Sequence, residues 1–81
     1  KSFMQDKTLK YRDIRRLLSK HGVYEVKHRG KGSHRLFVCD NVNGRKISYP
    51  VACHNENHEV NSYIVRRIRE KFNIAFESFC D

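Results

Sequence analysis

Apolar and polar positions along this chain follow a helical period in two segments. Between residues 11 and 21, apolar residues recur every three or four positions, which predicts an amphipathic helix with its charged residues on the outer face. Gly22 follows directly, where a left-handed C-terminal cap is expected to end this helix. The same period over residues 61–72 predicts a second long helix, with Asn61 or Ser62 as its N-cap.

Between these two segments the pattern changes to the two-residue alternation that is typical of β-strands. Strands are predicted at residues 23–28, 33–40 and 45–51, which carry β-branched and aromatic side chains. Asn43-Gly44 separates the last two strands. It predicts a tight hairpin, because a type I′ turn requires positive φ at both central residues.

The order of these elements predicts an α+β fold, an α-β-β-β-α sandwich with its helices packed on one face of a three-stranded antiparallel sheet. Pro50 indicates that the third strand lies at an edge or contains a bulge, because proline has no N–H to donate. Residues 52–59 are polar without a regular period, which predicts a solvent-exposed loop. Phe76 and Phe79, three residues apart, predict a short C-terminal helix that packs its rings on the core.

Size limits the chain to one domain. Its 81 residues allow a single hydrophobic core and argue against a deep substrate cavity. We interpret residues 9–81 as this domain and residues 1–8 as an N-terminal tail that is disordered up to about Lys7. The sequence contains no internal repeat or linker that indicates a second domain.

Charge narrows the choice of partners. The chain has 17 Lys and Arg against 9 Asp and Glu, a formal net charge of +8, which favours RNA, DNA, an acidic protein or an anionic membrane surface. No apolar run approaches the roughly 20 residues that cross a bilayer, so we expect a cytoplasmic protein with no membrane partner. The three cysteines lack C-x-x-C spacing, which favours free thiols in a reducing compartment.

Several runs of this sequence resemble the HicA toxin family. The similarity spans roughly Leu9 to Phe79, nearly the whole domain. Its most specific element is Gly-Ser-His, because this tripeptide follows a helix, a glycine and a strand. The runs are Tyr11-Arg12-Asp13-Ile14-Arg15-Arg16-Leu17-Leu18, Gly22-Val23-Tyr24, Gly32-Ser33-His34-Arg35-Leu36-Phe37, Ile47 to Val51 and Val65-Arg66-Arg67-Ile68.

The resemblance implies a fold similar to the double-stranded RNA-binding domain and an endoribonuclease that uses no metal or other cofactor. It also implies that the protein cleaves mRNA, inhibits translation and is neutralised by a HicB-type antitoxin. The catalytic histidine of the family follows Gly-Ser, which corresponds to His34. Many relatives have a second histidine where this chain has Arg35, and a lysine- and glycine-rich stretch where it has residues 58–63. The second departure bears on substrate handling or partner specificity.

The chemistry of RNA cleavage suits a histidine such as His34, because RNA supplies its own nucleophile, the 2′-hydroxyl. An imidazole with an ordinary pKa of about 6.5 is mostly neutral, yet basic, at cellular pH. Positive charge on Arg29, Lys31 and Arg35 favours that neutral form by repulsion. General acid–base help of this kind accelerates a reaction about 10²- to 10⁴-fold. The alternative is a histidine that faces solvent on a strand, or that binds RNA without cutting it.

Residues that position RNA are expected around the turn between the first two strands. Glycines there allow the backbone to approach a phosphate closely, and cations bind its charge. Tyr24, Phe37 and Tyr49 are candidates for stacking on bases, with a place in the core as the alternative, which is favoured for Phe37. The predicted RNA-binding set is Lys27, Arg29, Gly30, Lys31, Gly32, Ser33, Arg35 and Lys46.

The polar segment 52–59 carries two histidines, His54 and His58, which are candidates for the proton donor to the leaving group. Together with Cys53 they have the spacing of zinc ligands. A structural zinc site needs a fourth ligand that the sequence does not show, so we expect no metal site.

The main alternative function is a non-catalytic RNA-binding module of the same fold. It predicts the same basic charge, but no cleavage by His34. A DNA-binding domain or a protein adaptor is a third class. It would prefer duplex DNA, or would show no salt-sensitive binding of polyanions.

Overall fold

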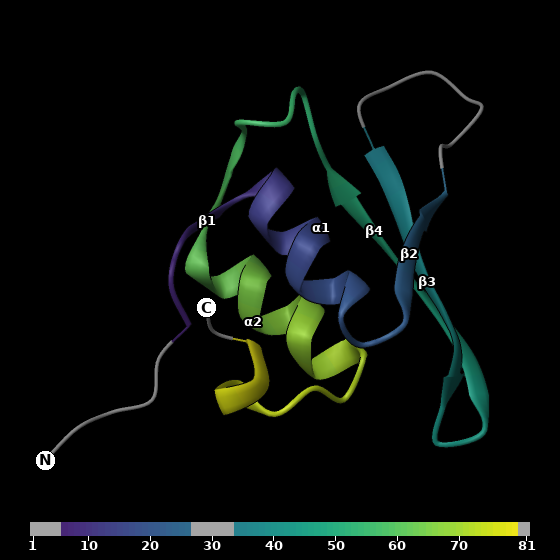
Figure 1. The fold of residues 1–81 in the computed structure, drawn as a ribbon. Helices are drawn as coiled ribbons and strands as arrows, with labels where there is room; N and C mark the ends of the chain where they lie inside the picture. Colours follow the sequence, from purple (N-terminus) through teal and green to yellow (C-terminus); the bar gives the residue numbers. More distant parts are fainter. Residues whose placement is uncertain (1–5, 27–33, 80–81) are drawn as a thin grey trace, which may run out of the picture.

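The protein has two layers, which a computed structural model describes for residues 6–26 and 34–79. Helices α1 (Tyr11–Ser19) and α2 (Ser62–Lys71) lie on one face of a three-stranded antiparallel sheet, and no described element covers the other face (Figure 1). A 3₁₀-helix, η1 (Phe76–Phe79), packs beneath the helices near the end of the chain. The predicted α+β class with helices on one face of the sheet is confirmed.

The sheet is a meander of β2 (Val23–Val26), β3 (His34–Val42) and β4 (Arg45–Ala52), in the order β2-β3-β4. Strand β3 is therefore central, and β4 lies at an edge. Pro50 occupies this edge strand, as its missing N–H predicts, opposite Leu36 of β3.

The hairpin between β3 and β4 has the predicted turn geometry. Asn43 and Gly44 have φ values of 55° and 83°, the positive values that a type I′ turn requires. The side chain of Asn41, near the end of β3, accepts a hydrogen bond of 2.7 Å from the Gly44 N–H, which fixes the turn. Gly22 has a φ of 79°, so the left-handed residue predicted after the first helix is also present.

Helix ends agree with the prediction at one helix and differ slightly at the other. Asn61 caps α2, because its side-chain oxygen accepts a hydrogen bond of 2.9 Å from the Ile64 N–H. Helix α1 ends at Ser19, two residues earlier than the predicted boundary at His21. The N–H of Gly22 bonds to the Ser19 carbonyl at 3.2 Å, so residues 20–22 form a turn that tightens the end of the helix.

The hydrophobic core fills the space between the helices and the sheet. The apolar stripe of α1 is fully covered, and Phe37 at the centre of β3 has no solvent exposure, which confirms the core interpretation for this ring. Cys39 and Cys53 are buried free thiols, whereas Cys80 lies outside the described residues. The core consists of Tyr11, Ile14, Leu17, Leu18, Val23, Phe37, Cys39, Val51, Cys53, Val60, Val65, Ile68, Phe72, Ile74 and Phe79.

The structure corrects the interpretation of residues 52–59 as an exposed loop. Glu59 belongs to a short strand, β5 (Glu59–Val60), which pairs antiparallel with β1 (Leu9–Lys10). Cys53 is buried in the core. The prediction was wrong because strands of two residues are too short to show an alternation, and their pairing joins segments about fifty residues apart.

Arg69 differs from the position that the helical period of residues 61–72 predicts for it, on the outer, solvated face of α2 beside Arg66, Arg67 and Lys71. Its guanidinium instead makes a bidentate ion pair with Asp6, at 2.8 and 3.0 Å, and donates to the Ile74 carbonyl at 3.1 Å. The side chains of Arg69 and Asp6 are only 14% and 6% exposed. Asp6 belongs to the predicted tail, so at least this residue of the tail is bound to the domain.

Candidate active site

The histidines singled out in the sequence belong to the same end of the sheet. His34 is the first residue of β3, and its Cα pairs with that of Ala52, the last residue of β4. His54 follows Ala52 after one residue. The side chain of His34 is not among the parts that the structure describes, so its position is known only through its backbone.

His54 and His58 lie next to each other in the loop that leaves β4. Their ring centroids are 5.2 Å apart, and the rings meet edge to face at 74°. His54 is exposed, and His58 is partly buried beside Ala52 and Val60. In the described ranges, no three metal-binding side chains gather around them or elsewhere.

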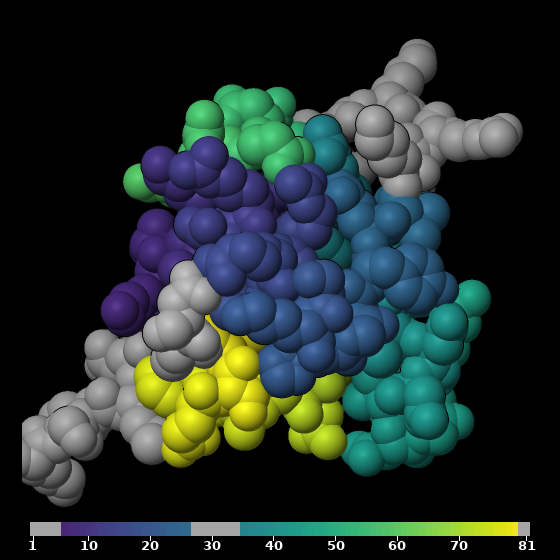
Figure 2. Space-filling view, in the orientation of Figure 1, coloured from purple at the N-terminus to yellow at the C-terminus, as the bar shows by residue number. Residues whose placement is uncertain are grey.

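The loop 53–58 is attached to the start of α1 by backbone hydrogen bonds. The N–H of Tyr11 donates to the His58 carbonyl at 2.8 Å, and the N–H of Arg12 donates to the Glu56 carbonyl at 3.1 Å. The first N–H groups of a helix have no partner within the helix, so these loop carbonyls satisfy them. In Figure 2 this loop, in green, lies directly against the purple start of the helix.

The loop is also braced from within. Asn55 accepts a hydrogen bond of 2.8 Å from the Asn57 N–H through its side-chain oxygen, which forms a local turn. The thiol of Cys53 donates to the Asn55 carbonyl at 3.3 Å, and burial raises the pKa of this thiol. Cys53 is therefore a protonated, structural group at neutral pH, and the two histidines stand on a fixed backbone.

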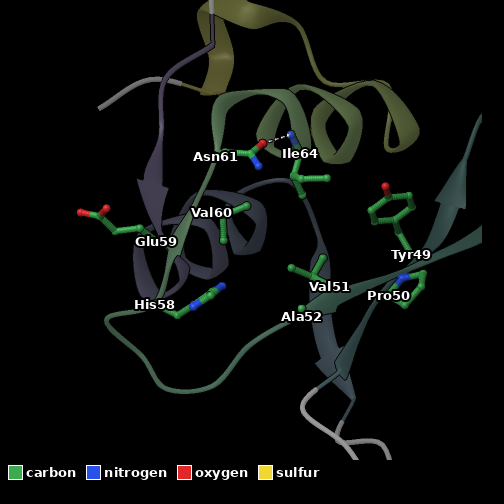
Figure 3. Close-up of a pocket in the computed structure, with 9 residues that line it drawn as sticks. All are labelled: Tyr49, Pro50, Val51, Ala52, His58, Glu59, Val60, Asn61 and Ile64. Atoms are coloured by element: carbon green, nitrogen blue, oxygen red, sulfur yellow. Dashed lines mark hydrogen bonds between the residues drawn. The ribbon is translucent and has the colours of Figure 1, made fainter.

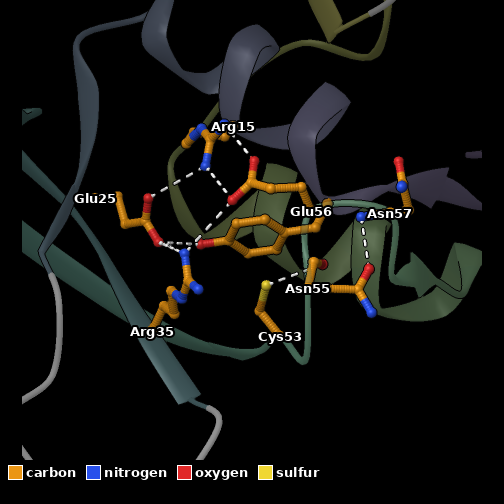
Figure 4. A network of polar contacts seen from close by, with 8 residues as sticks. Arg15, Glu25, Arg35, Cys53, Asn55, Glu56 and Asn57 are labelled. Atoms are coloured by element: carbon orange, nitrogen blue, oxygen red, sulfur yellow. Dashed lines mark hydrogen bonds and ion pairs between the residues drawn. The ribbon is translucent and has the colours of Figure 1, made fainter.

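A cluster of charged side chains fills the space between α1, β2, β3 and this loop (Figure 4). Glu25 of β2 stands at its centre, with a side chain that is 13% exposed. Its carboxylate accepts a hydrogen bond of 2.6 Å from the Tyr11 hydroxyl and one of 3.1 Å from Arg35. Burial, together with the bond to Glu25, strongly raises the pKa of Tyr11, so this hydroxyl remains a donor at any physiological pH.

Glu56 completes the cluster from the loop. It forms a close ion pair with Arg15 of α1 and lies 3.6 Å from Arg35. The hydrogen bond from Arg15 lowers the pKa of Glu56 and raises that of Arg15. The guanidiniums of Arg15 and Arg35 lie 5.8 and 5.6 Å from the centre of the Tyr11 ring, a cation–π distance.

Arg35, one of the residues predicted to bind RNA, belongs to this charged cluster. Its side chain is 27% exposed and shares the helix-facing side of the sheet with Phe37. Glu25 raises the pKa of Arg35 through its hydrogen bond. Arg35 follows His34 directly, so these ion pairs lie next to the start of β3.

Lys46 lies at the opposite end of the sheet from His34. It is exposed on β4, next to the hairpin turn. It lies six positions before Ala52, which corresponds to about 20 Å along a strand. The structure therefore does not bring Lys46 to the histidine end. The remaining predicted RNA-binding residues, Lys27, Arg29, Gly30, Lys31, Gly32 and Ser33, lie outside the described ranges.

The three aromatic side chains proposed for stacking have different surroundings. Phe37 is buried in the core and cannot meet a base. Tyr24 is 44% exposed on the uncovered face of the sheet, where its hydroxyl donates to Asp40 at 2.8 Å. Tyr49 is partly buried and lines a groove beside β4.

Sequence reasoning did not identify Glu25, Glu56 or Arg15 as parts of the site. One signal was present for Glu25: the alternation in β2 places it on the same side as Val23, the side that faces the helices. A carboxylate at a core-facing position requires partners. Glu56 gave no comparable signal, because its partner Arg15 is 41 residues away.

The fold and the site define a class of protein: a small basic α+β domain with helices on one face of a three-stranded sheet and histidines gathered at one end of it. The family model described as "HicA toxin of bacterial toxin-antitoxin" matches residues 11–74. The chain belongs to this family of toxins. Searches of curated proteins and of solved structures found no match. No described helix has the length and apolar character of a membrane span.

Proposed function

We propose that this toxin is a metal-independent endoribonuclease that cleaves mRNA with His34 as its general base and thereby inhibits translation. The observation that carries the proposal is the family match over residues 11–74, which includes the whole of β3 and the Gly-Ser-His run. The net charge of +8 supports an RNA substrate, because it attracts a polyanion.

The proposed reaction is an internal transesterification. His34 takes the proton of the ribose 2′-hydroxyl, and the 2′-oxygen attacks the adjacent phosphorus. The bond from phosphorus to the 5′-oxygen breaks, and that oxygen takes a proton from His54 or His58. The products are a 2′,3′-cyclic phosphate and a 5′-hydroxyl end.

The placement of His54 and His58 supports their role as proton donors in this scheme. Both belong to the loop that follows Ala52, the strand partner of His34. The loop is held by backbone bonds from α1 and by the ion pair between Arg15 and Glu56. A donor on a fixed backbone meets the geometric requirement of general acid catalysis better than one on an unsupported loop.

The decisive experiment compares His34→Ala with the unaltered protein on an unstructured RNA, with a chelator present. We expect cleavage by the unaltered protein and a loss of about 10²-fold or more in His34→Ala with RNA binding retained. His21→Ala is the matched control, because His21 lies at the far end of α1, where its ring contacts the Ser78 carbonyl at 3.0 Å. Binding without cleavage by the folded, unaltered protein would replace this proposal with the non-catalytic RNA-binding module.

The proposed partner is a HicB-type antitoxin that covers the histidine end of the sheet and excludes RNA. An acidic surface on this partner would complement the positive charge of the toxin and speed association. The corresponding test is a footprint of the complex by hydrogen exchange. We expect protection of β3 and of residues 53–58, and a complex that still cleaves RNA would contradict this mode of inhibition.

A further inference from the structure

A groove runs along the free edge of β4, between this strand and the start of α2 (Figure 3). Its volume of about 310 Å³ is near the lower end of the range of small-molecule sites. Val51 and Ile64 turn their side chains toward each other across it, with Tyr49 at one end and His58 at the other. Pro50 and Val60 also contribute apolar groups to its lining.

Polar groups line the groove alongside its apolar side chains, among them His58, Glu59 and Asn61. The oxygen of the Asn61 side chain caps α2, which leaves its NH₂ group as the donor. The carboxylate of Glu59 points away from the groove, so its negative charge does not face an occupant (Figure 3). A slot with an aromatic ring at one end, aliphatic side chains between, and amide and imidazole groups beside them suits a flat heteroaromatic ring.

The aromatic surface continues past the end of the groove onto α2. Arg67 donates a hydrogen bond of 3.0 Å to the Tyr63 hydroxyl, and its guanidinium lies 5.7 Å from the centre of that ring. The pKa of Arg67 is raised by this bond and, to a smaller extent, by the nearby Tyr49. Tyr63 is 61% exposed, a large aromatic side chain left on the surface. Tyrosine and arginine together form a surface on which bases stack.

The other end of the groove meets the proposed site of cleavage. Ala52 lines the groove and is the strand partner of His34, and His58 contacts His54 through its ring. We propose that this groove binds one nucleobase of the RNA substrate, next to the cleaved phosphate, with the base packed between Tyr49, Val51 and Ile64. This inference rests on the proposed function and names the subsite that gives the nuclease its base dependence.

An RNA base is a better candidate for the occupant of this groove than a side chain of a protein partner. The net charge of +8 attracts a polyanion, and the exposed cation Arg67 lies near Tyr49, where it can pair with a backbone phosphate next to the bound base. A strand of a partner protein would pair less well with the free edge of β4, because Pro50 removes one N–H donor from this edge.

The test measures binding of short single-stranded RNAs in which one base at a time is removed, using the His34→Ala protein so that the RNA stays intact. We expect removal of one particular base to weaken binding about tenfold, the effect of losing one stacked base. In Tyr49→Ala and in Arg67→Ala this penalty should shrink or vanish. Arg67 is exposed, so its variant keeps the fold even if Tyr49→Ala does not.

Two matched controls separate base stacking from general loss of charge or structure. Tyr49→Phe keeps the ring and should keep the tenfold penalty. Arg66→Ala removes a neighbouring exposed charge, which pairs with Glu70 within α2, and should lower affinity for all RNAs without changing the penalty of the missing base.

The groove is not a base site if the penalty persists undiminished in both Tyr49→Ala and Arg67→Ala. The base site is also refuted if these two variants bind RNA normally and lose only the binding of the antitoxin, because the groove would then be a binding site for that protein. Failure of the proposed function has a different signature. If the unaltered protein shows the penalty for the missing base but cleaves no RNA, the base site is supported and the proposed nuclease function is refuted. If Tyr49→Ala cleaves RNA with an unchanged base preference, the nuclease function is supported and the base site is refuted.

Discussion

Glu25 is the residue whose replacement should disturb the site most, because three elements meet at its carboxylate. It accepts hydrogen bonds from Tyr11 of α1 and Arg35 of β3, and Arg15 lies 3.6 Å away. Glu25→Ala removes all of these contacts at once. The Tyr11 hydroxyl then remains in a residue with no solvent exposure and without its acceptor.

The magnitude follows from these contacts. A buried hydroxyl without a partner costs about 1–3 kcal/mol, and a hydrogen bond to a charged group contributes about 1.5–3 kcal/mol. Arg35 is partly exposed and keeps Glu56 nearby, so only part of its contribution is lost. We expect Glu25→Ala to lower the free energy of unfolding by about 3 kcal/mol, which corresponds to a fall in Tm on the order of 15 °C for a domain of this size.

A double-mutant cycle with Tyr11→Phe isolates the part that belongs to the hydroxyl. Tyr11→Phe alone should cost about 1 kcal/mol, because no buried group is left without a partner. In the double variant the hydroxyl no longer needs an acceptor. The loss in the free energy of unfolding of the double variant should therefore be smaller than the sum of the losses of the two single variants by about 1.5 kcal/mol. Urea unfolding at neutral pH measures all four proteins.

The control is Glu70→Ala, which removes an exposed glutamate that pairs with Arg66 within α2 and should cost less than about 0.5 kcal/mol. Additive effects of Glu25→Ala and Tyr11→Phe would show that the bond between them does not stabilise the fold. A loss in Glu25→Ala no larger than that in Glu70→Ala would refute the central role assigned to this carboxylate.

Two further predictions concern ion pairs that join distant segments. The pKa of Glu56 lies below its ordinary value of 4.5 because of Arg15, so its contribution to stability is present above that value and is lost as pH falls through the lowered pKa. Glu56→Gln should therefore be less stable than the unaltered protein at neutral pH and equally stable in acid, and a constant difference across this range would contradict the linkage. Asp6→Asn should cost about 2 kcal/mol, because it removes the charge from a nearly buried bidentate pair with Arg69. Limited proteolysis should then cut the N-terminal segment faster, and unchanged cleavage and stability would show that the pair does not hold this segment.

The sequence by itself determined the regular elements, because their signals are local. The three- and four-residue spacing identified both helices, and alternation identified the strands at 23–26, 34–42 and 45–52 to within two residues. Residues 27, 28 and 33 of the predicted strands lie outside the described ranges. Asn43-Gly44 fixed the hairpin, because few residue pairs tolerate positive φ at both positions. Pro50 indicated an edge strand or a bulge, and β4 does lie at the edge of the sheet. The alternation over residues 33–40 also placed His34 near the start of a strand, which is the central one of the sheet.

Tertiary structure decided which of these residues surround the site. Arg15 and Glu56 are 41 residues apart, and Tyr11 and Glu25 are 14 apart, on different elements. No period relates such pairs, since their meeting depends on how a helix packs on a sheet and where a loop crosses its end. The pairing of β1 with β5 is another long-range contact of this kind.

The groove shows the same division. Its walls come from β4 and from the start of α2, and the sequence identified both elements without indicating a space between them. A local pattern states which face of an element is apolar, but the distance between two faces is set by the side chains that pack beneath them. The kinds of chemistry available were therefore visible in the sequence, whereas the arrangement of groups around a substrate arose only when the helices, the sheet and the loop packed together.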